Sequence, residues 1–482
     1  MRKLAASGLD PRAALERVRA HGGPELAERL THLDHVRAAR PRDASLDPPG
    51  EAAVDADVVF MGGGLSLLIA AELARRGVGV VVLERARAGA AHREWNASAS
   101  ELAPLVDAEI VSRAELETMI VARYREGVCA FHRGSPRRVT GVLDHAVDAG
   151  ALLARVRDVA ARRGVRLIDR ASVTGLGASA SRVRVGWTGA PDGSRSELVA
   201  RLAVDARGAS SPYATADLVC PTVGGVMRGL RFDPAIGDIL VTTEDADDGR
   251  QHVWEGFPGR DGELTVYLFY YARAEDSGAR GALAPLYARF FETITSYKAG
   301  DPALVRPTFG YIPGWSRLTR APAGPSPRVV VVGDAAARHS PLTFCGFGAM
   351  LRSFRPIAAA LARAIEQDRA PRAPLAPDED VHAWTGVLAR LMASGSLRGG
   401  ALNALLDDAF ASLEEMGNDR YAALLLDRMT ARDFVAFLRR TAERRPSVYF
   451  EVMRALGPSP IARWGVSLLL GSVGRSATAG GA

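Results

Sequence analysis

Runs of apolar and polar positions along the chain predict alternating strands and helices. Short, continuous apolar runs at residues 57–61, 78–83 and 329–332 are typical of strands buried on both faces of a parallel sheet. Apolar residues at helical spacing occupy residues 15–33 and 148–163, and Gly164 closes the second of these stretches. This pattern predicts an α/β protein that begins with a helical segment.

The first two apolar runs enclose a glycine turn. Gly62, Gly63 and Gly64 follow the first run, and a helical pattern then leads to the second run, which ends at Glu84. A strand, glycine turn, helix and strand within about thirty residues predict the βαβ unit whose first turn holds a pyrophosphate in Rossmann folds. The glycines let the backbone approach the phosphates, and the helix N-terminus offers free N–H groups. Leu67 replaces the third glycine of that fingerprint.

Glu84 supports a dinucleotide site over a plain α/β turn. It lies where an acidic side chain accepts hydrogen bonds from the adenosine ribose hydroxyls. A carboxylate at this place repels a 2′-phosphate, which argues against NADP.

Three later features favour FAD over NAD. An apolar strand at residues 202–206 breaks into a turn at Gly208, and the run 329–332 ends in Gly333-Asp334. Asp334 can bind the ribityl hydroxyls of a flavin. A helix beginning near Gly346 and Gly348 would point its N–H groups at the flavin pyrimidine edge, where helix N-termini stabilise negative charge by roughly 0.3–2 kcal/mol.

Composition narrows the class of protein. The 482 residues are 48% hydrophobic and 24% charged, which excludes a disordered chain and suggests two or three domains. The net charge is +6, but Lys3 and Lys298 are the only lysines, and the arginines are scattered rather than gathered in a basic block. Nucleic acid is therefore not expected as a partner.

The cysteines and the N-terminus point to an intracellular, cytoplasmic protein. Cys129, Cys220 and Cys345 have neither disulfide nor metal-ligand spacing, so we expect no metal site. The first twenty residues lack the apolar core of a secretory signal. The apolar segment 464–473 is about half of the ~20 residues that span a bilayer, so it is either a buried helix or a short segment resting on a membrane.

Three motifs carry a family resemblance over residues 54–370. They are Arg93-Glu94-Trp95-Asn96 with Ser98 and Glu101-Leu102; Gln251 to Pro258 with Thr265 to Tyr271; and Gly333-Asp334-Ala335 with Ser340 to Met350. Through these motifs the chain resembles the FAD-dependent lycopene cyclases of the CruA/CruP type, which are relatives of the aromatic-hydroxylase flavoprotein superfamily. Cys345 departs from the family pattern by replacing a glycine, and it would be strained if that position required a positive φ.

The resemblance implies a non-redox reaction. An acid protonates the terminal double bond of lycopene, the neighbouring double bond attacks the cation, and a proton is lost to leave a β-ionone ring. FAD in its reduced form would act through its negative charge near the cation. The residues expected to bind it are Gly62, Gly63, Gly64, Glu84, Arg93, Gly208, Gly333, Asp334, Pro341, Gly346 and Gly348.

The acid must be a carboxyl that stays neutral near pH 7, which requires an apolar setting. Glu255, among aromatic residues, is the first candidate, with Glu275 and Asp276 in reserve. A solvated hairpin carboxylate is the alternative reading of Glu255. Two other functions stay open: a redox flavoenzyme, such as a hydroxylase or reductase, acting on another polyprenoid, and a flavin-binding paralogue that protects against oxidants without cyclising anything.

These observations predict the following architecture. A helical extension at 1–53 precedes a discontinuous, Rossmann-like FAD-binding domain at 54–217 and 326–370, a sheet-based substrate domain at 218–325 is inserted, and a helical region at 371–482 follows. Because lycopene dissolves in bilayers, we expect the protein to associate peripherally with the cytoplasmic membrane, through its C-terminal helices. The sequence leaves the oligomeric state open.

Overall fold

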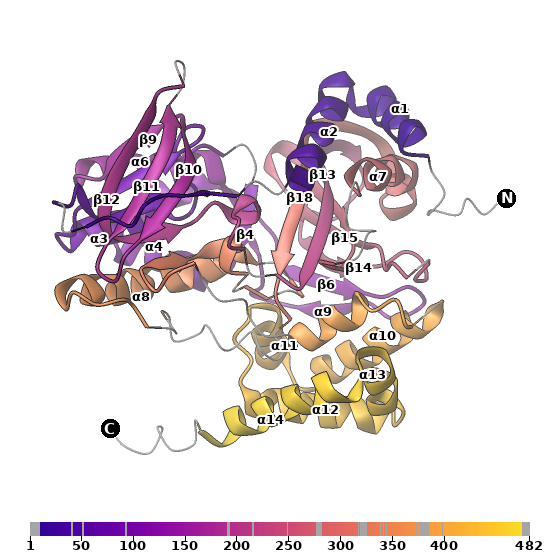
Figure 1. The fold of residues 1–482 in the computed structure, drawn as a ribbon. Helices are drawn as coiled ribbons and strands as arrows, with labels where there is room; N and C mark the ends of the chain where they lie inside the picture. The colour runs from indigo at the N-terminus through magenta and orange to yellow at the C-terminus, as the bar shows by residue number, and fades with distance from the viewer. Residues whose placement is uncertain are drawn as a thin grey trace.

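The computed structural model contains two large β-sheets, a small three-stranded sheet and a group of C-terminal helices (Figure 1). The structure describes residues 10–39, 42–50, 53–91, 94–189, 193–214, 216–247, 249–275, 282–316, 318, 325–337, 339–340, 342–343, 345–372, 375, 385–397 and 399–474.

The first sheet contains the predicted βαβ unit. Its strand order is β1 (Ala44–Ser45), β10 (Ala171–Ala178), β11 (Val183–Gly189), β12 (Arg195–Asp205), β2 (Ala56–Met61), β3 (Val80–Glu84) and β9 (Arg166–Asp169), and β19 (Val329–Val331) pairs with β12. Strands β19, β12, β2, β3 and β9 are parallel to one another. Their carboxyl ends therefore meet at one edge, where nucleotides bind in such sheets.

Both faces of strand β2 are buried, which explains its continuous apolar run. Val58 and Phe60 pack against α3 (Leu67–Arg75), α6 (Ala149–Arg162) and α8 (Gly346–Glu366). Val59 and Met61 point to the opposite face and pack with residues of β10, β11 and β12. The sheet therefore has helices on one face and an antiparallel extension curling over the other.

The second sheet lies beside the first (Figure 1). Its strand order is β17 (Ala272–Arg273), β13 (Leu218–Leu230), β16 (Leu264–Phe269), β15 (Val253–Pro258), β14 (Ile236–Val241), β6 (Glu126–Ala130) and β7 (Arg137–Val139), and β18 (Gly300–Gly314) pairs with β13. Helices α1 (Pro11–Gly22), α2 (Pro24–Ala39) and α7 (Leu283–Tyr297) cover one face. The N-terminal helices thus belong to the core around this sheet.

The third sheet joins segments that follow the βαβ unit. Its order is β4 (Glu94–Ala97), β8 (His145–Asp148) and β5 (Ile120–Arg123), with α4 (Ala99–Asp107) and α5 (Arg113–Met119) in the connection. Helix α4 begins with a capping box formed by Ser98 and Glu101. This cap fixes Glu101 beside the start of α8, a contact that matters at the site.

The C-terminal helices cover the other face of the second sheet. They are α9 (Gly386–Met392), α10 (Gly400–Glu415), α11 (Asn418–Leu425), α12 (Ala431–Arg444), α13 (Val448–Leu456) and α14 (Pro458–Gly474). Phe410, Leu406 and Tyr421 of this group share one apolar cluster with Phe257 and Phe269 of the sheet. Among the described residues, no helix combines the length and apolar character needed to cross a bilayer.

The α/β fold class with a Rossmann-like nucleotide-binding region is confirmed. Of the predicted domain ranges, 218–325 holds most strands of the second sheet, and the two segments 54–217 and 326–370 meet through the β12–β19 pair. Strands β6 and β7 lie within 54–217 in sequence but pair into the second sheet. The domain boundaries themselves stay a prediction.

Candidate functional site

The glycine turn after β2 leaves its backbone open toward a cavity. Gly62 has φ +112°, and a Cβ there would lie 2.6 Å from the Ala206 carbonyl oxygen, so only glycine fits. Around Gly64 the space is empty where a Cβ would stand. Within the described part of the chain, the N–H groups of Gly64, Leu65 and Ser66 have no hydrogen-bond partner. They are available to an anion at the start of α3.

Glu84 is held beside this turn by backbone donors. Its Oε2 accepts a hydrogen bond from the Gly63 N–H at 2.8 Å, and its Oε1 accepts one from the Ala86 N–H at 2.9 Å. A carboxylate oxygen can accept more than one hydrogen bond, so both oxygens keep acceptor capacity toward the cavity. The position expected of a ribose-binding carboxylate is thus occupied and oriented.

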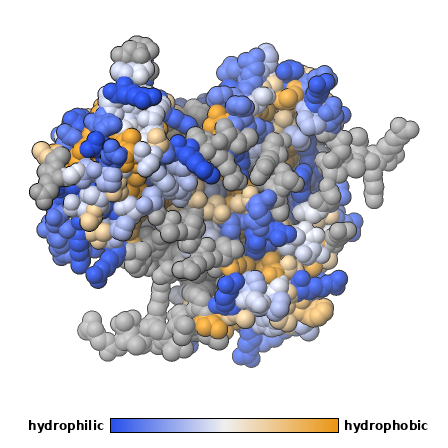
Figure 2. Space-filling model, viewed as in Figure 1, coloured by the Kyte–Doolittle hydropathy of each residue, from blue (hydrophilic) through white to orange (hydrophobic). Residues whose placement is uncertain are grey.

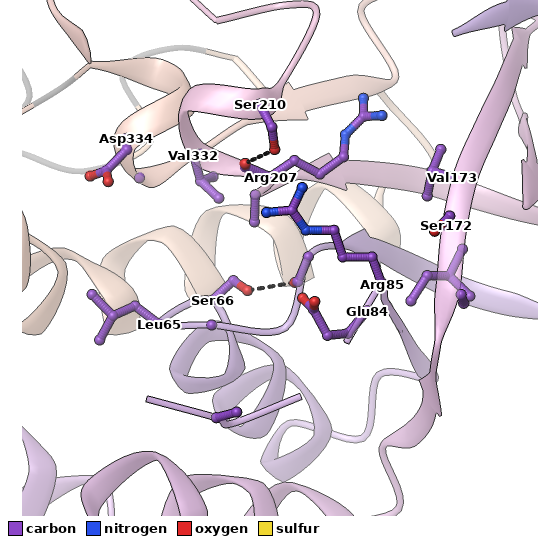
Figure 3. Close-up of a pocket in the computed structure, with 18 of the residues that line it drawn as sticks. Leu65, Ser66, Glu84, Arg85, Ser172, Val173, Arg207, Ser210, Val332 and Asp334 are labelled. Atoms are coloured by element: carbon purple, nitrogen blue, oxygen red, sulfur yellow. Dashed lines mark hydrogen bonds between the residues drawn. The ribbon is translucent and has the colours of Figure 1, made fainter. Parts of the chain in front are cut away.

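The cavity has a volume of about 620 Å³, within the usual range for ligand sites. At one end it is lined by Glu84, Arg85, Ser172 and Val173, and at the other by residues of the late chain segments (Figure 3). The predicted residues that line it are Gly62, Gly64, Glu84, Gly208, Gly333, Asp334 and Gly346. The carboxyl edge of the sheet therefore carries one elongated site assembled from segments far apart in sequence.

The late segments supply the second end of the cavity. Gly333, which has φ +61°, and Asp334 begin the short turn after β19, and Gly346 begins helix α8. A Cβ on Gly346 would stand 3.1 Å from Asp334 Oδ1, so the carboxylate and the helix N-terminus are neighbours. Cys345 precedes the helix with φ −74°, a conformation open to any L-residue. The position does not require a positive φ, so the cysteine is not strained there.

Two predicted glycines act next to the cavity rather than in its lining. A Cβ at Gly63 would stand 2.8 Å from the Ala88 side chain, so this glycine lets the turn pack against the segment after β3. A Cβ at Gly348 would overlap the carboxylate of Glu101, which also pairs with Arg352 of α8. Arg93 and Pro341, also predicted as cofactor-binding residues, lie outside the described residues.

The sequence motifs that carried the resemblance converge on helix α8. Trp95 lines the cavity, and its ring centroid lies 5.2 Å from that of Phe347 in the first turn of the helix. Glu101, from the same motif, contacts Gly348 and Arg352. Tyr271, from the hairpin motif, donates a hydrogen bond to the Leu342 carbonyl oxygen just before the helix. The three motifs therefore build one region.

Glu255 lies on the face of the second sheet that is turned toward this region. Its neighbours two residues away on β15, Val253 and Phe257, belong to the apolar cluster that also contains Leu342 and Cys345. Trp254 points to the opposite face and packs against α7. The side chain is thus directed away from the N-terminal helices and toward the segment that precedes α8.

The setting of Glu255 keeps its carboxyl neutral. The residue retains some accessible surface, yet the surrounding atoms are close enough that desolvation alone raises its pKa to about 8. Among the described residues it has no recorded hydrogen bond or ion pair. Burial also raises the pKa of the Cys345 thiol, which belongs to the same apolar cluster as Val253 and Phe257.

The reserve candidates differ from Glu255. Glu275 is exposed, and its Oε1 lies 3.6 Å from Arg390 Nη2. Water and a guanidinium therefore surround it, whereas a neutral acid requires an apolar setting. Asp276 lies outside the described residues. Of the candidates that the structure describes, Glu255 alone has the environment expected of the acid.

The sequence did not predict a network of charged side chains at the wall of the cavity. Arg207 lies between the buried Asp205 and Asp43, and its guanidinium bonds both Asp43 oxygens, Nη1 to Oδ1 at 2.8 Å and Nη2 to Oδ2 at 2.9 Å. Arg42, Asp43 and Arg85 also line the cavity. The Asp-Ala-Arg-Gly run at 205–208 was visible in the sequence, but its partner Asp43 lies in a segment whose position only the fold reveals.

Comparison with known proteins agrees with this picture at the level of fold. No family model and no curated protein matches the chain. A flavoprotein/dehydrogenase from Cytophaga hutchinsonii has a TM-score of 0.56 at 14% identity, covering 77% of this chain and 92% of its own. A geranylgeranyl bacteriochlorophyll reductase-like protein from Thermoplasma acidophilum has a TM-score of 0.54 at 16% identity, covering 83% and 99%.

A variant of the halogenase PltM, solved in complex with FAD, is a third neighbour. Its TM-score is 0.57 at 13% identity, and the match covers 86% of this chain and 96% of that one. At such identities the likeness shows the fold alone. The chain therefore has the fold of FAD-dependent flavoproteins.

Proposed function

We propose that the protein binds FAD in the cavity at the carboxyl edge of the first sheet. The fit rests on three observations: the glycine turn with the free N–H groups of Gly64, Leu65 and Ser66, the oriented carboxylate of Glu84, and the meeting of Asp334 with the start of α8. The first would hold the diphosphate, the second the adenosine ribose, and the third the ribityl chain and flavin.

The late end of the cavity favours FAD over a nicotinamide dinucleotide. The lining runs from Glu84 and Ser172 to Asp334 (Figure 3), and it also includes Gly346 and Met350 of α8. A helix N-terminus at the late end would stabilise the negative charge of a reduced flavin bound beside it. A flavoprotein neighbour that contains FAD supports the same choice.

For the reaction we propose acid-initiated cyclisation of lycopene ends to β-ionone rings. The observation that carries this proposal is the carboxyl of Glu255, whose pKa of about 8 leaves it protonated at neutral pH, on a sheet face turned toward the segment before α8. An acid of this kind is what protonation of a carbon–carbon double bond requires. The three motifs that resemble those of the cyclases meet in one region.

The steps balance without an oxidant or a net reductant. Glu255 gives its proton to the terminal double bond, and the π electrons of the neighbouring double bond close the ring. A proton then passes from an adjacent carbon to solvent, and Glu255 takes up a solvent proton, so the product is an isomer of the substrate. Aromatic side chains near Glu255, such as Tyr267 in register with it on β16, can stabilise the cation through their ring faces. Reduced FAD, when bound, supplies negative charge near that cation.

Expression in a lycopene-accumulating bacterial host tests this function. We expect pigment chromatography to show ring-bearing products with the native protein and unchanged lycopene with Glu255→Gln, while both proteins retain FAD. Glu275→Gln is the matched control, because it removes an exposed carboxylate from the same sheet region and should leave cyclisation intact. Unchanged lycopene in cells that contain FAD-loaded native protein would refute the cyclase function.

One observation favours a redox function as the second candidate. The reductase-like neighbour from Thermoplasma acidophilum is named for a geranylgeranyl substrate, a polyprenoid. A reductase or hydroxylase would consume NAD(P)H in proportion to product, whereas cyclisation consumes none. A non-cyclising protective paralogue would bind flavin and leave lycopene unchanged, and Glu255→Gln would not impair its protection.

We also propose that the C-terminal helices rest on the cytoplasmic membrane, where lycopene dissolves. Tyr449, Phe450 and Met453 share one exposed face of α13, and Phe450 is 66% exposed. The exposed Val466 of α14 adds to this apolar surface, and Figure 2 shows hydrophobic side chains gathered over the C-terminal helices. Apolar side chains beside scattered arginines suit a surface of anionic lipid.

Vesicle flotation tests this membrane contact. The native protein should float with anionic vesicles, and a variant carrying Phe450→Ser and Met453→Ser should stay with the unbound fraction. Val54→Ser and Val305→Ser, which change exposed apolar residues elsewhere, are the control. Equal flotation of all three proteins would refute the contact.

A further inference from the structure

The segment that follows the N-terminal helices forms part of the wall of the cofactor cavity. Val36 at the end of α2, and then Arg42 and Asp43, line the cavity together with the residues of the first sheet. These three positions belong to a region that sequence reasoning treated as an extension with a linker. The segment precedes the βαβ unit in sequence, so its place in the cavity wall does not follow from the Rossmann fold alone.

The first sheet is shaped to receive this segment. Strand β1 pairs in parallel with β10, and the Leu46 N–H donates to the Leu176 carbonyl oxygen at 3.1 Å. A Cβ on Gly175 would stand 2.9 Å from the Leu46 side chain, and one on Gly177 would overlap the Leu46 carbonyl oxygen. Two glycines of β10 thus leave the room in which the segment lies, so the docking is a specific fit.

Asp43 locks the segment to the cavity wall. Its side chain is only 6% exposed and bonds the Arg207 guanidinium with both oxygens. Burial alone would lower the pKa of Arg207, but the hydrogen bonds and charges of Asp43 and Asp205 outweigh burial and raise it, so the guanidinium stays charged. A buried two-oxygen pair of this kind is far stronger and better oriented than a surface ion pair.

The lock leaves cations available to a ligand. Arg207 is engaged by two carboxylates, whereas Arg42 and Arg85 line the cavity without a recorded ion pair among the described residues. In Figure 3 the Arg85 side chain extends over Glu84 toward Arg207. A dinucleotide brings a diphosphate with two negative charges. Arg85 and Arg42, which follows α2 and directly precedes Asp43, both line the cavity and match that demand.

The same segment is tied to the second sheet. Just before it, the Tyr311 hydroxyl of β18 donates a hydrogen bond to Asp34 Oδ1 at 2.5 Å, and the Arg37 guanidinium lies 4.2 Å from the centre of the Tyr311 ring. The chain passes from this anchor on the second sheet to Asp43 at the cavity within six residues. The segment therefore connects the sheet that carries Glu255 with the cofactor cavity.

We propose that residues 42–46 are a cofactor-retaining strap: Asp43 is a positioning residue that fixes the strap through Arg207, and Arg42 binds the diphosphate of the dinucleotide. This inference rests on the proposed FAD site. The strap would slow release of the cofactor, because the ligand can leave past this wall only when the Asp43 to Arg207 pair opens.

Cofactor affinity measured on the full chain tests the strap. FAD binding, followed by quenching of flavin fluorescence, should weaken at least tenfold in Asp43→Asn and in Arg42→Gln. Bound FAD should also dissociate faster from both variants when an excess of cofactor-free protein captures the released flavin. Asp47→Asn is the matched control, because it removes an exposed carboxylate from the same stretch of chain and has no part in the lock. Asp43→Glu should restore part of the lost affinity.

Further readouts separate the strap from a merely structural pair. The salt dependence of FAD binding should become shallower in Arg42→Gln, because one phosphate contact is lost. The double variant Asp43→Asn with Arg42→Gln should lose little more affinity than either single variant, since both changes disable the same strap. If Asp43→Asn lowers the melting temperature of the cofactor-free protein but binds FAD as the native protein does, the strap is refuted. If the native protein itself binds no FAD, the proposed function fails first, and the strap fails with it.

Discussion

Glu101 fills the place where a side chain on Gly348 would stand. The Glu101 carboxylate is almost completely buried, accepts a hydrogen bond from the Ser98 N–H at 2.9 Å, and forms an ion pair with Arg352 one turn further along α8. The motif that contains Glu101 thereby fixes the position of helix α8, which begins within the motif that ends at Met350. Because the start of α8 forms the late end of the cavity, this contact determines how the helix N-terminus meets the cofactor.

Gly348→Ala should therefore destabilise the protein and weaken FAD binding. The buried Glu101 carboxylate is held by hydrogen bonds from Ser98 and by the ion pair with Arg352, so it cannot move aside. The added methyl group therefore overpacks the site at a cost of about 1–3 kcal/mol. Urea unfolding of the cofactor-free protein measures this loss. Gly465→Ala is the control, because α14 has open space around Gly465, and there a helical alanine should be neutral or stabilising. Equal stability of Gly348→Ala and the native protein would contradict the assigned contact.

Gly64→Ala should weaken FAD binding without destabilising the protein. Its φ is not positive and no atom lies within 4 Å of the added Cβ, so the unfolding free energy should stay within about 0.5 kcal/mol of the native value. The methyl group would nevertheless project into the space assigned to the diphosphate. We expect the FAD dissociation constant to rise tenfold or more, and an unchanged constant would show that the phosphates bind elsewhere.

The βαβ unit and its neighbours were predictable from sequence because they depend on local pattern. Strands β2 and β3, helix α6 and strand β19 lie within a few residues of the apolar runs that predicted them. Their carboxyl-end residues follow from the parallel topology alone. Most of the residues predicted to bind the cofactor line one cavity for the same reason, since glycine turns and strand ends carry strong local signals. That they bind FAD stays a prediction.

The remaining features depend on contacts between distant segments. Asp43 and Arg207 are separated by 164 positions, and neither residue carries a pattern that predicts the other. Strands β6 and β7 pair into the second sheet although they lie among the elements of the first. The face to which Glu255 points depends on strand register, because a shift by one residue would turn the side chain to the opposite face.

Replacing Cys345 by the glycine that the resembling cyclases carry at this place should not improve the protein. Cys345 already has a permitted negative φ and a buried thiol. Cys345→Gly adds freedom to the unfolded chain and removes a buried side chain, so it should lower the unfolding free energy by about 1 kcal/mol or more and leave FAD affinity unchanged. A gain in FAD affinity would show that the native thiol obstructs the site.

The pH dependence of stability should reveal the neutral carboxyl of Glu255. Its pKa is raised from 4.5 to about 8 in the folded protein, so between these values the unfolded chain releases a proton that the folded protein keeps. This group therefore favours folding fully below pH 4.5, and its contribution is lost as the pH rises toward 8. The size is on the order of a few kcal/mol.

Urea unfolding of the native protein and of Glu255→Gln across this pH range measures that contribution. The variant carries no ionisable group at this position, so its stability relative to the native protein should rise with pH and level off above about pH 8. The cyclisation rate of the native protein should fall as the pH passes through the same value, because the acid is then ionised. Parallel stability curves for the two proteins would show that Glu255 titrates normally.

The most direct test of the central claim is the mass of the carotenoid product formed by the FAD-loaded protein in deuterated water. Proton donation by Glu255, whose proton exchanges with solvent, predicts a ring-bearing isomer of lycopene that carries one deuteron for each ring and forms without consumption of NAD(P)H. A product with added oxygen or with two added hydrogens, formed in proportion to NAD(P)H consumed, would contradict cyclisation and favour a redox flavoenzyme.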